Sequence, residues 1–329
     1  MTNPQQCPKV SVCMLAYNQV KFIAQAIESV LMQQVDFDYE IVIGEDFSTD
    51  GTRALVADYQ QRYPDKFRAL LHEKNLGARE NGMQTLTACR GQYMAVLEGD
   101  DYWNDPLKLQ KQVEFLEAHP ECSMVFTAAK TLHGNELRDW DPPPVISNTY
   151  SLNDILERNF ICTPTVMYRN GIQDYLPDWF QKMQIGDWPL HILHALHGEI
   201  GYLHEPTVVY RVHSNGAWGG LSAVKRLEIS IATARQLIQV LPGQCRNALQ
   251  RGIGFAEKQI VAYGLVWGNE PSVGRRYLFT LLLKGEWPFE SFNHALRALV
   301  WFICPPMGRR LQKRRAMQRG TIPEEGLHH

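Results

Sequence analysis

Residues 98–103, Glu-Gly-Asp-Asp-Tyr-Trp, contain two adjacent carboxylates, those of Asp100 and Asp101. They follow an apolar run from Tyr93 to Leu97 that is typical of a buried strand. Paired carboxylates in such a place repel each other and are costly to desolvate, so a cation is expected beside them. Their oxygen atoms suit Mg²⁺ or Mn²⁺, which often share a site with substrate phosphates. Such a pair alone is common in surface turns, and it is the setting of this pair within the first hundred residues that favours a metal and diphosphate site.

Strand-like and helix-like runs alternate through the first hundred residues. Strands are predicted at 10–15, 39–44, 67–71 and 93–97, and helices at 20–33, 52–63 and 82–90. This alternation predicts an α/β fold in which parallel strands are joined by right-handed crossovers and covered by helices on both faces. The first strand is followed by neither a glycine-rich dinucleotide fingerprint nor a Walker-type loop, which weakens a dehydrogenase or P-loop NTPase interpretation.

Polar residues follow three of these strands. Tyr17 comes after the first strand, Asp46 after the second, and the Asp100–Asp101 pair after the fourth. Ligands of parallel sheets bind at the carboxyl ends of the strands. We therefore expect these side chains to converge on one edge of the sheet.

Residues 10–18, 45–52 and 98–103 together resemble the family 2 glycosyltransferases of the GT-A fold. The usual motifs of that family are a strand ending near Tyr-Asn, an Asp-Asp-x-Ser-x-Asp-Gly-Thr block and an Asp-x-Asp-like cluster. This chain departs from them at Leu15-Ala16, where Pro-Thr is usual, at Glu45, where Asp is usual, and at Phe47, where Gly, Asn or Ser is commoner. The match continues through 185–188 and 210–213, whereas residues 216–329 gain nothing from it.

The resemblance implies a donor site in the loops after the strands. Tyr17 would stack on the nucleoside base, and Asp46 would accept a hydrogen bond from its ring N–H. Alone, these two residues would be a half-buried loop aromatic and a turn or cap residue. The nucleotide-binding residues expected from the resemblance are Leu15, Tyr17, Asn18, Glu45, Asp46, Arg79 and Asp100.

The same resemblance implies a Mn²⁺ or Mg²⁺ cofactor. Asp101 would ligate the metal, and Asp100 would contact the ribose or the metal's water shell. His213 would complete the metal site, and Trp218 in the glycine-rich loop after it would close over the donor. Arg79 would contact the diphosphate or pair with one of the carboxylates, although a solvated loop charge is an equal alternative.

Asp187 opens a helix expected at 190–197, and the resemblance implies that it is the general base. The helix dipole keeps a carboxylate in the first turn ionised, which suits a base. The alternative is that Asp187 only caps this helix, with Pro189 in the first turn. His191, His194 and His197 lie three residues apart on the same helix, and we interpret them as a partly polar helix face rather than a zinc site.

Composition describes an ordinary globular protein. The 329 residues carry a formal net charge of −2, which argues against nucleic acid as a partner. The seven scattered cysteines indicate reduced thiols, and neither a signal peptide nor a membrane-spanning run is expected. We expect a GT-A domain at 1–220 and a helical region at 221–329.

The end of the chain combines apolar and basic segments. Residues 292–307 are rich in aromatic and aliphatic side chains, and six Lys and Arg follow between Arg309 and Arg319. Such a combination suits attachment to anionic lipid, and a core helix with a solvated tail is an equal alternative. A cytoplasmic protein is expected, at the inner face of the cytoplasmic membrane if residues 292–319 bind lipid.

The function that the sequence favours is inverting, metal-dependent transfer of a sugar from a nucleotide-diphosphate donor, with UDP preferred. The acceptor would be a hydroxyl of a glycan or lipid-linked molecule, as in surface polysaccharide assembly. A sugar-phosphate nucleotidyltransferase is one alternative, but it would need a basic, glycine-rich loop after the first strand, and residues 16–19 lack it. A non-catalytic carbohydrate-binding protein is another.

Overall fold

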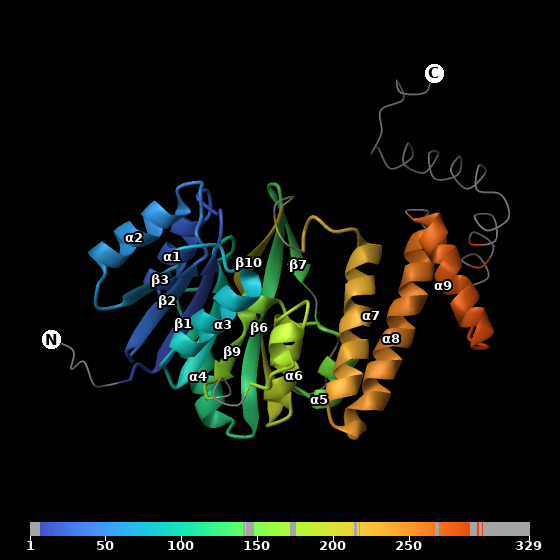
Figure 1. Ribbon diagram of the computed structural model, residues 1–329. Coiled ribbons are helices and arrows are strands. Elements are labelled where there is room, and N and C mark those ends of the chain that lie inside the picture. Colours follow the sequence, from blue (N-terminus) through green and yellow to red (C-terminus); the bar gives the residue numbers. More distant parts are fainter. Residues whose placement is uncertain are drawn as a thin grey trace, which may run out of the picture. The chain divides into compact units, whose positions relative to one another are not determined.

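The computed structural model describes residues 7–140, 142, 148–171, 176–213, 216, 218–266, 270–289, 295 and 298, and the structural statements below concern these residues. Contacts divide the chain into two compact units, Met1–Gly220 and Leu221–His329, and each is described by itself. Figure 1 shows strands and helices interleaved in the first unit and helices alone in the second.

The described part of the first unit forms one ten-stranded sheet and six α-helices. The strands are β1 (Val10–Ala16), β2 (Tyr39–Glu45), β3 (Phe67–Leu71), β4 (Tyr93–Glu98), β5 (Tyr102–Trp103), β6 (Cys122–His133), β7 (Glu136–Trp140), β8 (Thr149–Tyr150), β9 (Met167–Arg169) and β10 (Glu199–Val212). The helices are α1 (Ile23–Leu31), α2 (Thr52–Arg62), α3 (Ala78–Ala88), α4 (Lys108–Ala118), α5 (Leu152–Glu157) and α6 (Asp187–Ala195), with 3₁₀ turns at Thr163–Thr165 and Phe180–Lys182.

The sheet is parallel in its first half and mixed in its second. Its order is β3-β2-β1-β4-β9-β6-β10-β5, and the first four strands are parallel, as the alternation predicts. Beyond β4 the sheet becomes mixed, because β9 runs antiparallel to both β4 and β6. β9 begins only at Met167, since Thr163–Thr165 forms a 3₁₀ turn around Pro164, which has no N–H for a ladder.

A hairpin occupies part of a segment that the sequence pattern marks as a loop. β7 pairs with β6 through a two-residue turn, with His133 opposite Glu136. Gly134 supplies the positive φ of 62° that such turns require. The Gly134-Asn135 dipeptide was the signal for this hairpin.

Helices cover both faces of the sheet, as predicted. Val12 and Met14 of β1 are fully buried in the main hydrophobic core, together with Ile27 of α1 and Val56 of α2. The other face meets α3, where the Asn81 side-chain amide donates to the Gly44 carbonyl of β2 at 2.9 Å. Alternate residues of each strand thus anchor helices on opposite sides, and the strand ends are held rigidly.

The described part of the second unit is helical, as expected, and contains α7 (Ala223–Val240), α8 (Arg246–Val261) and α9 (Pro271–Leu283). A 3₁₀ turn at Gly243–Cys245 precedes α8, and a π-helical turn at Ala262–Val266 follows it. Among the residues described, no helix combines the length and apolarity needed to cross a membrane. The membrane contact predicted for 292–319 falls outside the described residues, apart from positions 295 and 298.

Candidate active site

The three polar loops meet at the carboxyl edge of β1, β2 and β4. Leu15 of β1 lies opposite both Gly44 of β2 and Glu98 of β4, so these strands end together. The Gly99 amide donates to the Leu15 carbonyl at 2.9 Å, and a Cβ on Gly99 would lie 2.4 Å from Gln19 Oε1. The small Gly99 residue lets the carboxylate loop lie closely against the loop that carries Tyr17.

The loops after β1 and β2 are tied to each other by Asn18. Its side-chain oxygen accepts from the Thr49 amide at 2.9 Å, and its own amide donates to Ser48 Oγ at 2.9 Å. Asn18 and Phe47 have positive φ values of 51° and 60°, a left-handed conformation that is strained for a phenylalanine. Tyr17 remains 49% exposed, so its ring is available to a ligand.

The second loop holds two buried carboxylates with different tasks. Asp46 is 2% exposed, and its two oxygens accept from the amides of Leu76 at 2.6 Å and Gly77 at 3.0 Å. Glu45 is fully buried, accepts from the Ser48 amide at 2.7 Å and forms an ion pair with Arg53 at 2.8 Å. Glu45 therefore stabilises the conformation of the loop. Each Asp46 oxygen accepts only one of these hydrogen bonds, so it can accept another from a nucleoside base.

Glu98, Asp100 and Asp101 form the acidic part of the site. Asp101 is 1% exposed; its Oδ1 accepts from the Arg211 amide at 2.7 Å, and its Oδ2 is buried without a partner. Glu98 Oε2 is also buried and unpartnered. Burial and the nearby charges of Asp100 and Asp187 raise the pKa of Glu98 to about 8, and burial with neighbouring carboxylates likewise raises the pKa of Asp101.

The end of β10 supplies the basic part. His213 Nε2 lies 3.1 Å from Asp100 Oδ2, so the structure brings these two predicted residues together. The Arg211 side chain donates to the Asp100 carbonyl at 2.5 Å and packs over the rings of Phe22 and Tyr102. The sequence pattern did not single out Arg211, although it lies two residues before His213.

The chemistry of these donors fits a hard divalent cation. Glu98 Oε2 and Asp101 Oδ2 are buried carboxylate oxygens without a hydrogen-bond partner, and oxygen atoms of this kind are ligands that Mg²⁺ or Mn²⁺ prefers. Within the described part of the chain, no three His, Cys, Asp or Glu side chains are already grouped as a metal-binding set. Asp100, Asp101 and His213 would thus supply part of the coordination, as is usual for Mg²⁺-type ions that also bind water and phosphate.

Asp187 is the first residue of α6 and is half-buried. Its Oδ2 accepts from Asn159 Nδ2 at 3.1 Å and from Thr163 Oγ1 at 3.3 Å, and its Oδ1 accepts from the Trp188 amide at 2.7 Å. Its influence on the pKa of Glu98 places it within electrostatic reach of the acidic residues. Asn159 and Thr163, which orient it, carry no motif by which the sequence would have revealed them.

Arg79 lies beside Asp187 rather than in solvent, so the solvated-loop alternative is wrong. Its Nη2 donates to the Phe180 carbonyl at 2.6 Å, and its guanidinium lies 4.6 Å from the centroid of the Phe180 ring. A Cβ on Gly186 would come within 1.9 Å of Arg79 Nη1. Burial lowers the pKa of Arg79, and the charge of Asp187 opposes this shift. The absence of a side chain at Gly186 therefore leaves room for the Arg79 guanidinium.

Two other predictions have different outcomes. His191 and His194 are 0% and 3% exposed, so the interpretation as a partly polar helix face is wrong for them. The Tyr168 hydroxyl lies 2.7 Å from His191 Nδ1, and the Tyr168 ring stacks on the His194 ring. Trp218 is half-buried, and because residues 214, 215 and 217 are not described, its role as a lid stays a prediction.

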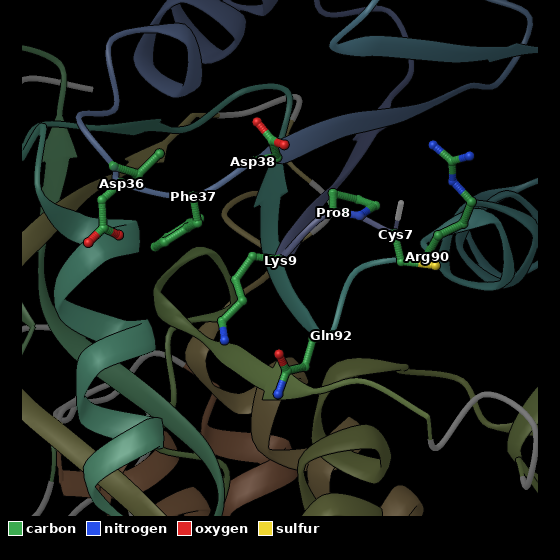
Figure 2. A pocket seen from close by; sticks show the side chains of 9 residues that line it. Cys7, Pro8, Lys9, Asp36, Phe37, Asp38, Arg90 and Gln92 are labelled. Carbon is green, nitrogen blue, oxygen red and sulfur yellow. The ribbon is translucent and has the colours of Figure 1, made fainter. Parts of the chain in front are cut away.

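A cavity of about 800 Å³ lies at the opposite edge of the sheet (Figure 2). Its lining comes from segments just before β1, β2 and β4, including Lys9, Asp38 and Gln92. Two cations at this cavity are already paired, Lys9 with Glu117 and Arg90 with Glu40. It has no geometric connection to the carboxyl edge and is not part of the site.

Comparison with known proteins places this arrangement in a family. Residues 11–175 match the model of glycosyl transferase family 2. A glycosyltransferase of Nostoc sp. is 37% identical over 310 residues, which cover 90% of this chain and 94% of the relative. An uncharacterised protein of Mycobacterium tuberculosis is 39% identical over 210 residues, and the match spans 60% of that protein's length.

Solved structures agree on the fold. TarS 1–349 of Staphylococcus aureus in complex with UDP-GlcNAc has a TM-score of 0.57 at 17% identity and covers 85% of this chain and 93% of that one. The mannosyltransferase PcManGT of Pyrobaculum calidifontis, in complex with GDP-Man and Mn²⁺, has a TM-score of 0.59 at 16% identity and covers 95% and 86%. The GT-A fold expected from the sequence is confirmed. The chain belongs to glycosyl transferase family 2.

Proposed function

We propose that this protein is an inverting, metal-dependent glycosyltransferase that moves a sugar from a UDP-linked donor to a hydroxyl group. The observation that carries the proposal is the placement of one oriented carboxylate, Asp187, within electrostatic reach of the acidic edge. The neighbouring complexes with UDP-GlcNAc and with GDP-Man and Mn²⁺ support a nucleotide-sugar donor and a divalent metal.

The donor is held by the loops after β1 and β2. The exposed Tyr17 ring stacks on the base, and Asp46 accepts from the base N–H with lone pairs that the Leu76 and Gly77 amides leave free. The strained, mutually bonded loops are rigid, so little ordering accompanies binding. Asp100 would contact the ribose or a water bound to the metal.

The leaving diphosphate is stabilised at the acidic edge. Asp101, Asp100 and His213 would hold a Mn²⁺ or Mg²⁺ ion, which would supply charge neutralisation for the diphosphate. Arg211 anchors the backbone of this region through Asp100 and Asp101, so the donor atoms keep their positions. Trp218 covers the sugar and excludes water.

Asp187 accepts the proton of the acceptor hydroxyl. Asn159 and Thr163 hold Oδ2, which leaves the remaining lone pairs of the carboxylate for the substrate. The Arg79 cation and the Asp187 carboxylate attract each other electrostatically. A glycan or lipid-linked acceptor fits this scheme, and residues 292–319 would bring the enzyme to the membrane.

The experiment is a screen of UDP-GlcNAc, UDP-glucose, UDP-galactose and GDP-mannose with Mn²⁺, read by thermal shift and by release of free nucleotide. We expect one UDP-sugar to stabilise the protein and to be slowly hydrolysed to UDP. A ligand present at a hundred times its Kd adds about 2.7 kcal/mol of stability. Stabilisation without UDP release, in the presence of diverse glycan acceptors, would indicate a non-catalytic binding protein. Release of pyrophosphate from UTP and a sugar phosphate would indicate the nucleotidyltransferase.

A further inference from the structure

The helix α9 and the turn after it expose an unusual number of large apolar side chains. Phe279, Leu282, Leu283 and Trp287 are 61%, 49%, 73% and 64% exposed. Spacings of three and four residues put Phe279, Leu282 and Leu283 on one side of the helix. These four residues are called the α9 face below.

The α9 face is not the side that packs in the core. Leu278 and Leu281 of the same helix are 7% and 0% exposed and pack with Val261 and Leu265. A helix with one buried face ordinarily presents polar residues on the other side. Here the second side is apolar as well, which marks an interaction surface.

Cations border the α9 face. Arg275 and Arg276 lie one turn before Phe279, and Lys284 follows Leu283 directly. Arg276 is paired with Glu228 and Lys284 with Glu257, yet their side chains are 65% and 45% exposed and can still reach an anionic surface. Residues 221–329 carry sixteen Lys and Arg against seven Asp and Glu, whereas residues 1–220 carry seventeen against twenty-eight.

The excess of positive charge in residues 221–329 favours an anionic partner. The exposed apolar side chains indicate whether this partner is a second copy of the chain or a lipid bilayer. A second copy of this chain offers an acidic first unit, but its exposed large apolar residues among those described lie in separate elements: Tyr17, Met32, Phe47, Tyr63, Leu107 and Leu137. That unit has no apolar counterpart for the α9 face. A bilayer accepts Leu and Phe at the acyl boundary and Trp at the headgroup level, with Lys and Arg against lipid phosphates.

We propose that the α9 face is a membrane-docking surface that binds anionic phospholipid bilayers. Its apolar side chains enter the interface and its flanking cations contact lipid phosphates. This surface lies outside 292–319, and the proposal does not depend on the glycosyl transfer proposed above.

The test is co-sedimentation of the full-length protein with vesicles of phosphatidylcholine, with and without phosphatidylglycerol. We expect binding only to the anionic vesicles, weakened by added salt because the Debye length shortens. Phe279→Ser combined with Leu283→Ser should raise the apparent Kd by at least about tenfold, since two inserted side chains lose their apolar contact. Leu283→Ser alone should weaken binding, whereas the matched control Leu137→Ser, a leucine 52% exposed on β7, should not.

A spectroscopic measurement locates the contact. Anionic vesicles should shift the tryptophan emission of the wild-type protein to shorter wavelength, and Trp287→Phe should remove most of that shift. Circular dichroism and UDP release should be unchanged in every variant, so failure here is distinguishable from failure of the proposed function.

Three outcomes overturn the proposal. One is equal binding to neutral and anionic vesicles, or to neither. Another is that wild type, Leu283→Ser and Leu137→Ser bind anionic vesicles equally well. In that case, loss of binding on removal of residues 308–329 would assign the contact to the basic C-terminal segment. The third is a dimer that Leu283→Ser dissociates, which would make a second copy the occupant.

Discussion

Replacing Asp187 by Asn separates a catalytic base from a helix cap. The substitution keeps the shape of the side chain and removes the ionisable oxygen. Asp187 accepts from Asn159 and Thr163 on Oδ2 and from the Trp188 amide on Oδ1. An Asn can keep its carbonyl oxygen on only one of these sides, so its NH₂ group faces a donor on the other.

The structural cost of that mismatch is about one hydrogen bond, ~0.5–1.5 kcal/mol of the free energy of unfolding. Loss of general base catalysis is larger, about 10²–10⁴-fold in kcat, which equals ~3–5 kcal/mol of activation free energy. We therefore expect a melting temperature lowered by only a few degrees, unchanged UDP affinity and a collapse of kcat.

Asp154 offers a matched control. It occupies the first turn of α5, where its Oδ2 accepts from the amide and hydroxyl of Ser151 in a capping box. Asp154→Asn makes the same chemical change at a carboxylate that only caps a helix. Steady-state transfer assays should show near-normal kcat for Asp154→Asn and a loss of at least about a hundredfold for Asp187→Asn. Similar kcat values for the two variants would refute the assignment of the base.

Three further perturbations test particular contacts. Gly186→Ala puts a methyl group where the Arg79 guanidinium lies, 1.9 Å from Nη1; we expect kcat to fall with little change in UDP affinity, and normal kinetics would show that Arg79 does not support the base. Burial lowers the pKa of Lys108 from 10.5 to about 7. Above pH 7 the unfolded chain therefore binds more protons at this residue than the folded chain. The free energy of unfolding due to this group then rises with pH by up to ~1.4 kcal/mol per pH unit. Urea denaturation should show that Lys108→Met is more stabilising at pH 7 than at pH 8.5, and a pH-independent difference would contradict this. Phe47→Asn should raise stability by ~0.5–1 kcal/mol in calorimetry, because Asn tolerates the left-handed φ of 60°; a lower melting temperature would mean that the Phe47 ring contributes more than its strain costs.

Local patterns were enough to predict the part of the fold that positions the donor. Strands β1, β2 and β4 and the helices between them follow from hydrophobic periodicity, and parallel pairing places their carboxyl ends together. The antiparallel β9 could not be predicted in the same way, because its direction depends on the Thr163–Thr165 turn and on pairing with distant strands.

The same division holds for the site. Asp100 and His213 are 113 positions apart in the sequence. Only the family resemblance predicted that they belong to one site. Glu45 looked like a ligand residue, but its contacts with Ser48 and Arg53 depend on how the loop folds. Asn159, Thr163 and Arg211 are ordinary polar residues in sequence, and their importance comes from which carboxylate each one contacts.

The central claim is that the acidic edge binds a nucleotide diphosphate together with a divalent metal. Calorimetric titration of UDP with and without Mn²⁺, in the wild type and in Asp101→Asn, tests it most directly. Asn keeps an oxygen for the Arg211 amide and removes the charge of the unpartnered Oδ2. We predict that Mn²⁺ increases UDP affinity at least about tenfold in the wild type and not in the variant, which should otherwise fold normally. Equal metal dependence in both proteins, or none in the wild type, would contradict the account.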